Sequence, residues 1–182
     1  MRRVLIRPAD PGRDAAACAA IYAPYVAGTA ISLEELPPDG ADMARRIEAI
    51  SSGYPWLVGV EGDAVIGYAY GARHRERAAY RWAADVAIYV ADGHRGRGVG
   101  KQLYSALLAL LGRQGLRIAC AGITLPNPAS VALHESLGFE PVGIYRRVAF
   151  KQGRWWDVGW WQLELPADGG DPPDDPGPPA PL

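Results

Sequence analysis

The sequence predicts a single domain of the α+β class, or of a mixed-sheet α/β class. Segments with strand character and segments with helix character alternate along the chain, and turn signals typical of β-hairpins occur towards both ends. The length of 182 residues suits one domain. Hydrophobic residues make up 49% of the chain and charged residues 21%, which indicates a globular protein with a substantial core.

The first half of the chain carries several strand patterns and two helix patterns. Asp14 is expected to cap the first helix, because an aspartate side chain accepts hydrogen bonds from the free amides at a helix start. The turn Glu61–Asp63 separates two β-rich segments and predicts a hairpin. In order, the elements are a strand over Val4–Arg7, helices over Asp14–Tyr22 and Asp42–Ile50, and strands over Trp56–Val60, Ala64–Tyr70 and Trp82–Val90.

The second half begins with a glycine-rich turn, Gly93–Gly100, that opens a strongly amphipathic helix. Large apolar residues recur every three or four positions over Val99–Leu110, which is the spacing of one helix face. Asn127 is expected to cap a second, shorter helix that Gly138 ends. The remaining elements are a strand over Arg117–Leu125 and a hairpin formed by Phe139–Phe150 and Arg154–Leu165.

The composition changes sharply at Pro166. From there to the C-terminus the chain holds seven of its 16 prolines, four aspartates and no lysine or arginine. Such a segment has too little apolar surface to offset the entropy of ordering, so we expect a folded domain over 1–165 and a disordered tail over 166–182. Without the four tail aspartates, 16 acidic residues face 19 basic ones, and the domain carries about +3.

Charge and cysteine usage exclude several classes of protein. The net charge of −1 argues against an overall basic protein that binds nucleic acid. Cys18 and Cys120 are too few and too far apart for a disulfide scaffold, so we expect a reduced, cytoplasmic protein. The three histidines and two cysteines lack metal-ligand spacing, so we expect no metal. The apolar runs are too short to cross a bilayer, so we expect no membrane partner.

The segment Arg95–Lys101, with the sequence RGRGVGK, carries the first chemical signal. Glycines let backbone amides approach a ligand closely, and a helix start adds free N–H groups and positive charge. Together they predict a cradle for a pyrophosphate. A P-loop is excluded because it needs glycine at position 95 and serine or threonine at 102, and the Rossmann pattern needs glycine at 101. The alternative is a loop that only turns the chain.

A second motif follows in the next strand–helix unit, where Asn127, Ser130, His134 and Gly138-Phe139 recur at fixed spacing. Together the two motifs resemble those of the GNAT N-acetyltransferase superfamily. The resemblance implies a largely antiparallel mixed sheet with one splayed strand pair, flanked by helices, and acetyl-CoA as co-substrate. It implies main-chain contacts to the cofactor by Ile88, Tyr89 and Val90, and places Asn127 and Ser130 near the pantetheine arm. For the pyrophosphate it implies Arg95, Gly96, Arg97, Gly98, Val99 and Gly100.

A narrower similarity covers about Ile6–Leu165. Segments such as Tyr54–Val58, Ala79–Trp82 and Gly153–Gln162 occur in the order found in phosphinothricin, or methionine sulfoximine, N-acetyltransferases. The resemblance implies transfer of acetyl to the α-amine of a small glutamate-like amino acid. It also implies substrate contacts by Arg75 and Thr124, and a homodimer formed near the C-terminal hairpin.

Two residues are candidates for proton transfer, namely Asp85 and His134. Strand alternation puts Asp85 on the same face as Tyr89, at a position where the related enzymes carry glutamate, so the shorter aspartate is expected to act through a water. His134 occupies the place of a proton donor to the thiolate and titrates near neutrality. The alternative for Asp85 is an ion pair with a nearby arginine. The arginines in question are Arg75, Arg77 and Arg81. The alternative for His134 is a histidine that only packs in the core.

We expect direct attack of the amine on the thioester, because no cysteine has a histidine neighbour in the sequence. One alternative is an acetyltransferase for a protein N-terminus, an aminoglycoside or a polyamine. The other is a non-catalytic module that binds CoA or RNA through the basic stretch Arg73–Arg81.

Overall fold

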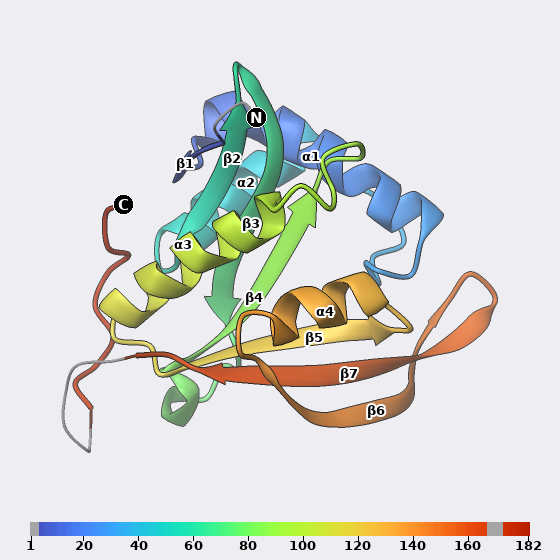
Figure 1. Ribbon diagram of the computed structural model, residues 1–182. Helices are drawn as coiled ribbons and strands as arrows, with labels where there is room; N and C mark the ends of the chain where they lie inside the picture. Colours follow the sequence, from blue (N-terminus) through green and yellow to red (C-terminus); the bar gives the residue numbers. More distant parts are fainter. Residues whose placement is uncertain (1–3, 167–172) are drawn as a thin grey trace.

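The computed structural model describes residues 4–166 and 173–182, and these fold around a seven-stranded sheet of order β1-β2-β3-β4-β5-β7-β6 (Figure 1). Neighbouring strands are antiparallel except β4 and β5, which are parallel. The predicted mixed, largely antiparallel sheet is therefore confirmed. The elements are β1 (Leu5–Pro8), α1 (Pro11–Gly28), α2 (Gly40–Ser51), β2 (Trp56–Glu61), β3 (Ala64–Arg73), the 3₁₀ helix η1 (Ala78–Tyr80), β4 (Ala83–Val90), α3 (Val99–Arg113), β5 (Ile118–Leu125), α4 (Pro128–Glu135), β6 (Glu140–Lys151) and β7 (Arg154–Glu164).

Helices cover both faces of the sheet. Helices α1 and α2 pack on one face around a core that includes Ile47 and Tyr68, and α3 packs on the other around Leu103 and Leu107. Side chains of β4 alternate between these cores as predicted. Residue Tyr89 lies with the α1 core, whereas Ala84 and Val86 belong to the α3 core. The face that carries Asp85 is therefore the α1 face.

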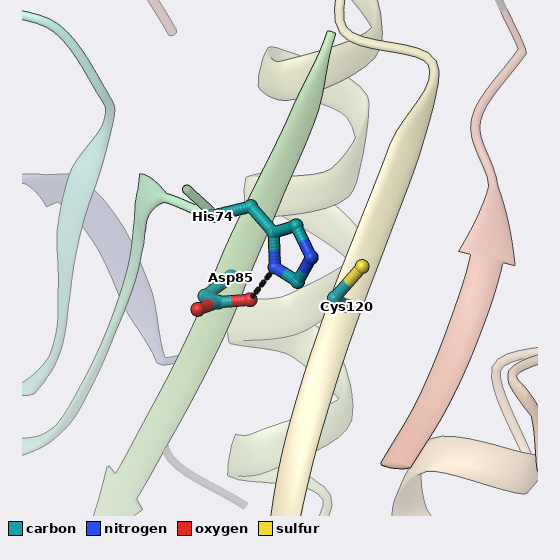
Figure 2. Close-up of side chains that lie close together, drawn as sticks. All are labelled: His74, Asp85 and Cys120. Atoms are coloured by element: carbon teal, nitrogen blue, oxygen red, sulfur yellow. Dashed lines mark hydrogen bonds and ion pairs between the residues drawn. The ribbon is translucent and has the colours of Figure 1, made fainter. Parts of the chain in front are cut away.

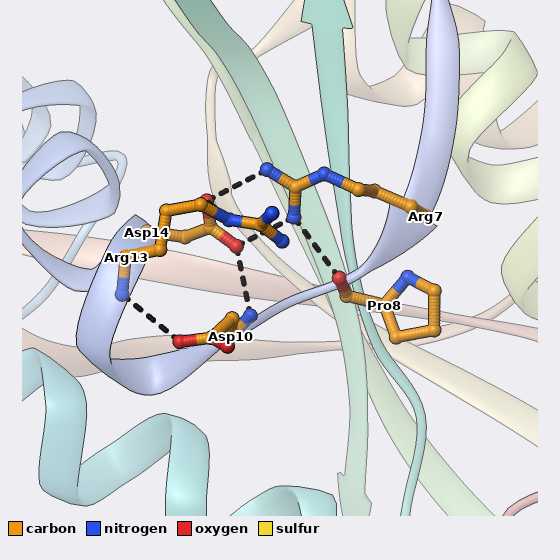
Figure 3. A network of polar contacts seen from close by, with 5 residues as sticks. All are labelled: Arg7, Pro8, Asp10, Arg13 and Asp14. Carbon is orange, nitrogen blue, oxygen red and sulfur yellow. Dashed lines mark hydrogen bonds and ion pairs between the residues drawn. The ribbon is translucent and has the colours of Figure 1, made fainter.

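Helix α1 is capped by Asp10, whereas the sequence predicted Asp14 as the cap. The Asp10 side chain accepts a hydrogen bond from the Arg13 backbone N–H at 3.0 Å. Asp14 lies inside the first turn, where its carboxylate accepts hydrogen bonds from the Arg7 guanidinium at 2.6 and 2.8 Å (Figure 3). Burial alone would raise the pKa of Asp14, but the bonds from Arg7 and the Asp10 backbone lower it to about 2. Asp14 thus ties α1 to β1.

Both N-terminal helices differ from their predicted bounds. Helix α1 continues past Tyr22 to Gly28, because Tyr25 in its last turns is buried against the sheet. Helix α2 begins after Asp39, whose side chain accepts from the Asp42 backbone N–H at 2.7 Å. None of the helices in the described ranges combines the length and the apolar composition needed to span a membrane.

Strands β4 and β5 separate along their length. They pair only over Ala83–Asp85 and Ile118–Cys120, and beyond these rows β4 stays paired with β3 alone (Figure 1). Beyond these rows the opened side of β4 has no partner strand, so a ligand can approach its main chain there. This confirms the splayed pair that the resemblance implied.

Residues 173–182 run along the C-terminal end of α3. The Trp82 indole donates to the Asp174 carbonyl at 2.8 Å. The Gly177 N–H donates to the Gln114 carbonyl at 2.8 Å, and the Gln114 side-chain amide donates to the Gly177 carbonyl at 3.0 Å. Residues 167–172 of the tail predicted to be disordered lie outside the described residues.

Candidate active site

A groove of about 470 Å³ lies between the end of β4, the start of α3 and helix α4. Most of the residues predicted to bind the cofactor line it, although three do not. The predicted residues in its wall are Ile88, Val90, Arg95, Gly96, Gly98, Gly100, Asn127 and Ser130. Residues from four separate stretches of the chain thus meet at one groove, which is how the fold converts two sequence motifs into a site.

Glycines shape the loop that opens α3. Gly96 and Gly98 have φ angles of 71° and 80°, in the left-handed region that glycine adopts without strain. A Cβ on Gly100 would lie 3.2 Å from the Leu133 side chain, so glycine there allows α4 to approach α3 closely. The first-turn N–H groups and the positive end of the helix dipole meet the groove, where Lys101 adds charge. This chemistry suits a phosphate-bearing ligand.

Three residues predicted to bind the cofactor have side chains elsewhere. The Arg97 guanidinium donates to the Glu61 carboxylate at 2.9 Å, across the loop. The Val99 side chain is buried in the α3 core. The Tyr89 ring packs edge-on against Tyr22 of α1, on the opposite face of the sheet. These residues can therefore offer only main-chain atoms to the groove. For Tyr89 a main-chain contact is what the resemblance implied, whereas the side-chain directions of Arg97 and Val99 depend on contacts with Glu61 and the α3 core.

Tyr25 is a site residue that the sequence motifs do not reveal. Its hydroxyl donates to the Val90 carbonyl at 2.6 Å, at the end of β4. It also accepts from the Arg95 side chain at 3.1 Å, and the Arg95 guanidinium lies 4.8 Å from the centre of the Tyr25 ring. Helix α1 thereby holds the first arginine of the loop in place beside the strand end. The sequence motifs could not predict this role of Tyr25, because it depends on where helix α1 crosses the sheet.

A small cavity of about 70 Å³ lies where β4 and β5 separate. It shares Ile88, Asn127 and Ser130 with the groove. It shares Gly122 and Thr124 with a pocket on the α1 face of the sheet. This junction therefore joins the groove to the opposite face, so that ligands bound on the two sides can meet there.

His134 lies at the junction and is 3% exposed. Its Nδ1 is 2.7 Å from the Ser130 carbonyl, which can only accept, so Nδ1 carries the hydrogen of the neutral ring. The Nε2 atom lies 3.1 Å from the Tyr104 hydroxyl, which then donates to it. Burial lowers the pKa of His134, against the opposing effect of the Ser130 carbonyl. The ring is therefore a neutral base with a fixed orientation, and Tyr104 is a second residue that the motifs did not identify.

The pocket on the α1 face has a volume of about 500 Å³ and is lined by Tyr22, Ser32, Glu34 and Thr124, among others. We call it the Thr124 pocket, since the predicted substrate residue Thr124 lies in its wall. The Glu34 carboxylate accepts from Arg46 at 2.6 and 2.9 Å and from the Tyr22 hydroxyl at 2.9 Å. These bonds make the wall rigid.

A buried lysine closes this side of the site. The Lys151 ammonium, at the tip of the β6–β7 hairpin, donates to the Val26 carbonyl at 2.6 Å and to the Ser32 carbonyl at 2.7 Å. Burial lowers its pKa, although Glu34 opposes the shift. The hairpin is thus fastened to the end of α1 and to the loop that lines the Thr124 pocket.

Asp85 lies in the last paired row of β4 and β5, opposite Cys120, at the point where the splay begins. The alternative interpretation was an ion pair of Asp85 with an arginine. Its carboxylate forms no such ion pair with Arg75, Arg77 or Arg81, all of which are among the described residues. It lies 2.6 Å from the Nδ1 atom of His74 (Figure 2). Burial raises the pKa of Asp85, and the bond to His74 opposes this.

His74, Asp85 and Cys120 also have metal-ligand chemistry, and each offers a ligand atom within 4.8 Å of the others. Among the described residues, these three form the one group of such side chains that lie close enough together to hold a metal ion. Two nitrogen or oxygen ligands of one tetrahedral zinc ion would lie about 3.3 Å apart, given bonds of about 2.0 Å. The 2.6 Å separation of His74 and Asp85 is instead that of a hydrogen bond.

A third cavity of about 400 Å³, the Arg75 pocket, is lined by His74, Arg75, Cys120 and Trp160, among others. The Arg75 guanidinium lies 5.6 Å from the centre of the Trp160 ring. A Cβ on Gly122 would lie 3.2 Å from the Trp160 ring, so the indole stands directly on that glycine. The predicted substrate residues Arg75 and Thr124 thus line two separate pockets, and Trp160 belongs to the wall of the Arg75 pocket.

A splayed parallel strand pair above a glycine-rich helix start, with an acceptor pocket across the sheet, is the arrangement of an acyltransferase. The pattern of the acetyltransferase (GNAT) domain family matches residues 9–160. Phosphinothricin N-acetyltransferase of Streptomyces viridochromogenes is 38% identical over 168 residues, which cover 91% of this chain and 91% of the relative. L-methionine sulfoximine/L-methionine sulfone acetyltransferase of Salmonella typhimurium is 37% identical over 161 residues, which cover 88% and 94%.

Solved structures agree. A GNAT superfamily phosphinothricin acetyltransferase from Sinorhizobium meliloti, in complex with acetyl-CoA, has a TM-score of 0.87 to this structure. The two chains are 37% identical, and the match covers 95% of this chain and 92% of the other. The chain therefore belongs to the GNAT acetyltransferase family. It is an N-acetyltransferase, as its sequence motifs predicted.

Proposed function

We propose that the protein transfers the acetyl group of acetyl-CoA to the α-amine of a small glutamate-like amino acid, such as phosphinothricin or methionine sulfoximine. The observation that carries this proposal is the junction between β4 and β5. It links a groove with phosphate-binding chemistry to the Thr124 pocket on the opposite face of the sheet. The names of the relatives support the choice of acceptor.

The cofactor would lie along the groove. We assign the pyrophosphate to the amides of Arg95–Gly100, with Arg97 and Val99 contributing through their main chain. The pantetheine arm would run along the main chain of Ile88–Val90, on the side of β4 that has no partner strand, and pass Asn127 and Ser130. The thioester would then reach the junction, where N–H groups on the opened side of β4 can donate to the oxyanion of the tetrahedral intermediate.

Deprotonation of the acceptor amine costs little free energy. An α-ammonium group has a pKa of about 8, so its deprotonation at neutral pH costs on the order of 1.4 kcal/mol. We assign this proton transfer to Asp85, acting through a water, and direct attack on the thioester follows. We assign the return of a proton to the CoA thiolate to His134. After the attack the C–S bond breaks and the nitrogen loses its second proton, which His134 would take up and pass to the CoA thiolate. A ring whose pKa is lowered by burial releases such a proton readily.

Arg75 and Thr124 are our candidates for substrate contact. An arginine can hold a carboxylate through two parallel hydrogen bonds, and Arg75 lines a pocket together with His74 and Trp160. We further propose a homodimer formed through β6, and a cytoplasmic setting, which the two free cysteines support.

The test is release of the CoA thiol from acetyl-CoA by purified protein with a panel of amines. The panel contains phosphinothricin, methionine sulfoximine, the twenty amino acids, spermidine, an aminoglycoside and an N-terminal peptide. We expect selective turnover of the first two. Turnover of the peptide, spermidine or the aminoglycoside alone would overturn the proposed acceptor. Tight acetyl-CoA binding with no turnover would favour a non-catalytic module.

A further inference from the structure

Asp85 does not stand alone in the site, because His74 is fixed against it. Ala72 of β3 pairs with Asp85 of β4, so His74, two residues further along, projects on the same face as a diagonal neighbour. Its ring meets Tyr80 and Trp160 edge-on, with centroid distances of 5.8 and 6.2 Å. The His74 side chain is 14% exposed. One orientation of the imidazole is therefore held from three sides.

This orientation determines which nitrogen of the ring is basic. An ionised carboxylate can only accept, so the Nδ1 atom of His74, 2.6 Å from Asp85, carries a hydrogen. The Nε2 atom of the neutral ring then keeps its lone pair. Figure 2 shows the ring between Asp85 and Cys120, with its second nitrogen turned away from the carboxylate. A histidine oriented by a carboxylate in this way is the arrangement of a general base.

We propose that His74 and Asp85 form a catalytic dyad in which the Nε2 atom of His74 accepts the proton of the acceptor ammonium. The proposal rests on the proposed function and refines it, since Asp85 becomes a positioning residue. The ammonium N–H bond breaks and an Nε2–H bond forms, with one water relaying the proton. The neutral amine then attacks the thioester, and Asp85 stabilises the imidazolium. The proton on Nε2 finally leaves to solvent.

The position of His74 supports this assignment. His74 and Arg75 line the same pocket, so an acceptor whose carboxylate meets Arg75 has its amine near the imidazole. Cys120 in that pocket and Gly122 at the junction are alternate residues of β5, about 7 Å apart along the strand. One water and an imidazole span such a distance.

The neighbouring thiol does not compete for this role. Burial and the charge of Asp85 raise the pKa of Cys120 to about 11, which keeps the sulfur protonated. A protonated thiol is a poor nucleophile and a poor metal ligand. The dyad therefore acts on the bound acceptor and not on Cys120.

Two substitutions test the proposal, with turnover of the best acceptor of the amine panel as the reference. His74→Asn keeps an amide N–H where Nδ1 donates to Asp85, but it removes the basic Nε2. We expect His74→Asn to lower kcat by about a hundred-fold or more, with an unchanged Kd for acetyl-CoA. His74→Ala is expected to lose similar activity and to recover part of it when imidazole is added.

Three outcomes would overturn the dyad. The first is wild-type kcat in His74→Asn, because only the hydrogen bond to Asp85 would then matter. The second is an inactive His74→Ala that imidazole does not rescue. The third is an acetyl group on Cys120, found by intact-protein mass spectrometry after incubation with acetyl-CoA alone. Because the reference acceptor is whichever amine reacts, a wrong choice of acceptor leaves this test intact.

Discussion

At the scale of single residues, buried His134 is expected to make stability depend on pH. Its folded-state pKa is lowered from the ordinary value of 6.5. Between these two values the unfolded chain binds the proton and the folded chain does not, so this stability is present above about pH 6.5 and is lost as the pH falls. His134→Asn keeps a donor for the Ser130 carbonyl but does not titrate.

Urea unfolding at about pH 7 and about pH 5 measures this effect. The free energy of unfolding of the wild type should fall more on acidification than that of His134→Asn. The extra loss should be up to about 1.4 kcal/mol for every pH unit that separates the folded and unfolded pKa values of His134. Because both proteins share every other titrating group, the difference between their slopes isolates His134. Parallel slopes would contradict the prediction.

Residues of the site differ in how far the sequence reveals them. Asp85 follows from strand alternation together with the motif around it, and its place on the α1 face is confirmed. His74 does not, because β3 was expected to end at Tyr70. The strand continues to Arg73, and only then does His74 fall beside Asp85. Because β3 ends three residues later than predicted, the sequence analysis did not identify His74 as the partner of Asp85.

At the scale of elements, the turn before α3 yields a prediction about cofactor binding. Gly98→Ala places a Cβ in ordinary contact with the Gln102 side chain, at 3.9 Å, but the backbone there has φ of 80°. The strain should cost about 1 kcal/mol and displace the amides that meet the groove. Gly62→Ala is the matched control, since Gly62 in the β2–β3 turn has φ of 64°.

Both alanine variants should lose similar stability in urea unfolding. Calorimetric titration with acetyl-CoA should show a several-fold higher Kd for Gly98→Ala and an unchanged Kd for Gly62→Ala. Equal affinities in the two variants would mean that the glycine loop only turns the chain.

Helix starts show why element bounds are harder to predict than element types. Asp10 and Asp14 are both suitable caps by residue type, and their spacing does not decide between them. The choice is made by Arg7, a residue of the adjacent strand that binds the Asp14 carboxylate inside the helix. The local pattern predicted the seven strands and the four α-helices of the described residues but not the 3₁₀ helix η1, whereas tertiary contacts set where the elements begin.

At the scale of the whole molecule, the tail illustrates a limit of composition. Residues 173–182 contain little apolar surface, which is why the sequence predicts disorder there. Their contacts with Trp82 and Gln114 are made largely by backbone carbonyl and amide groups. Every residue type carries a backbone carbonyl, and every type except proline carries a backbone N–H, so composition gives no sign of these contacts.

Strand β6 forms one edge of the sheet, and it exposes large apolar side chains that a monomer would leave in water. Val142, Ile144, Val148 and Phe150 are between 53% and 61% exposed. We expect a second copy of the chain to cover them, so the protein should sediment as a dimer. Val148→Asp and Phe150→Glu each place a charge in that interface and should give monomers.

Leu36→Glu is the control for this experiment, because Leu36 is 82% exposed but belongs to the loop before α2 and not to β6. It should remain dimeric in sedimentation velocity runs at the same concentrations. A wild-type protein that stays monomeric at every concentration would refute the dimer. Lys151 lies at the end of β6 and fastens the hairpin to the wall of the Thr124 pocket. The monomeric variants are therefore also expected to bind the amino-acid acceptor more weakly than Leu36→Glu does.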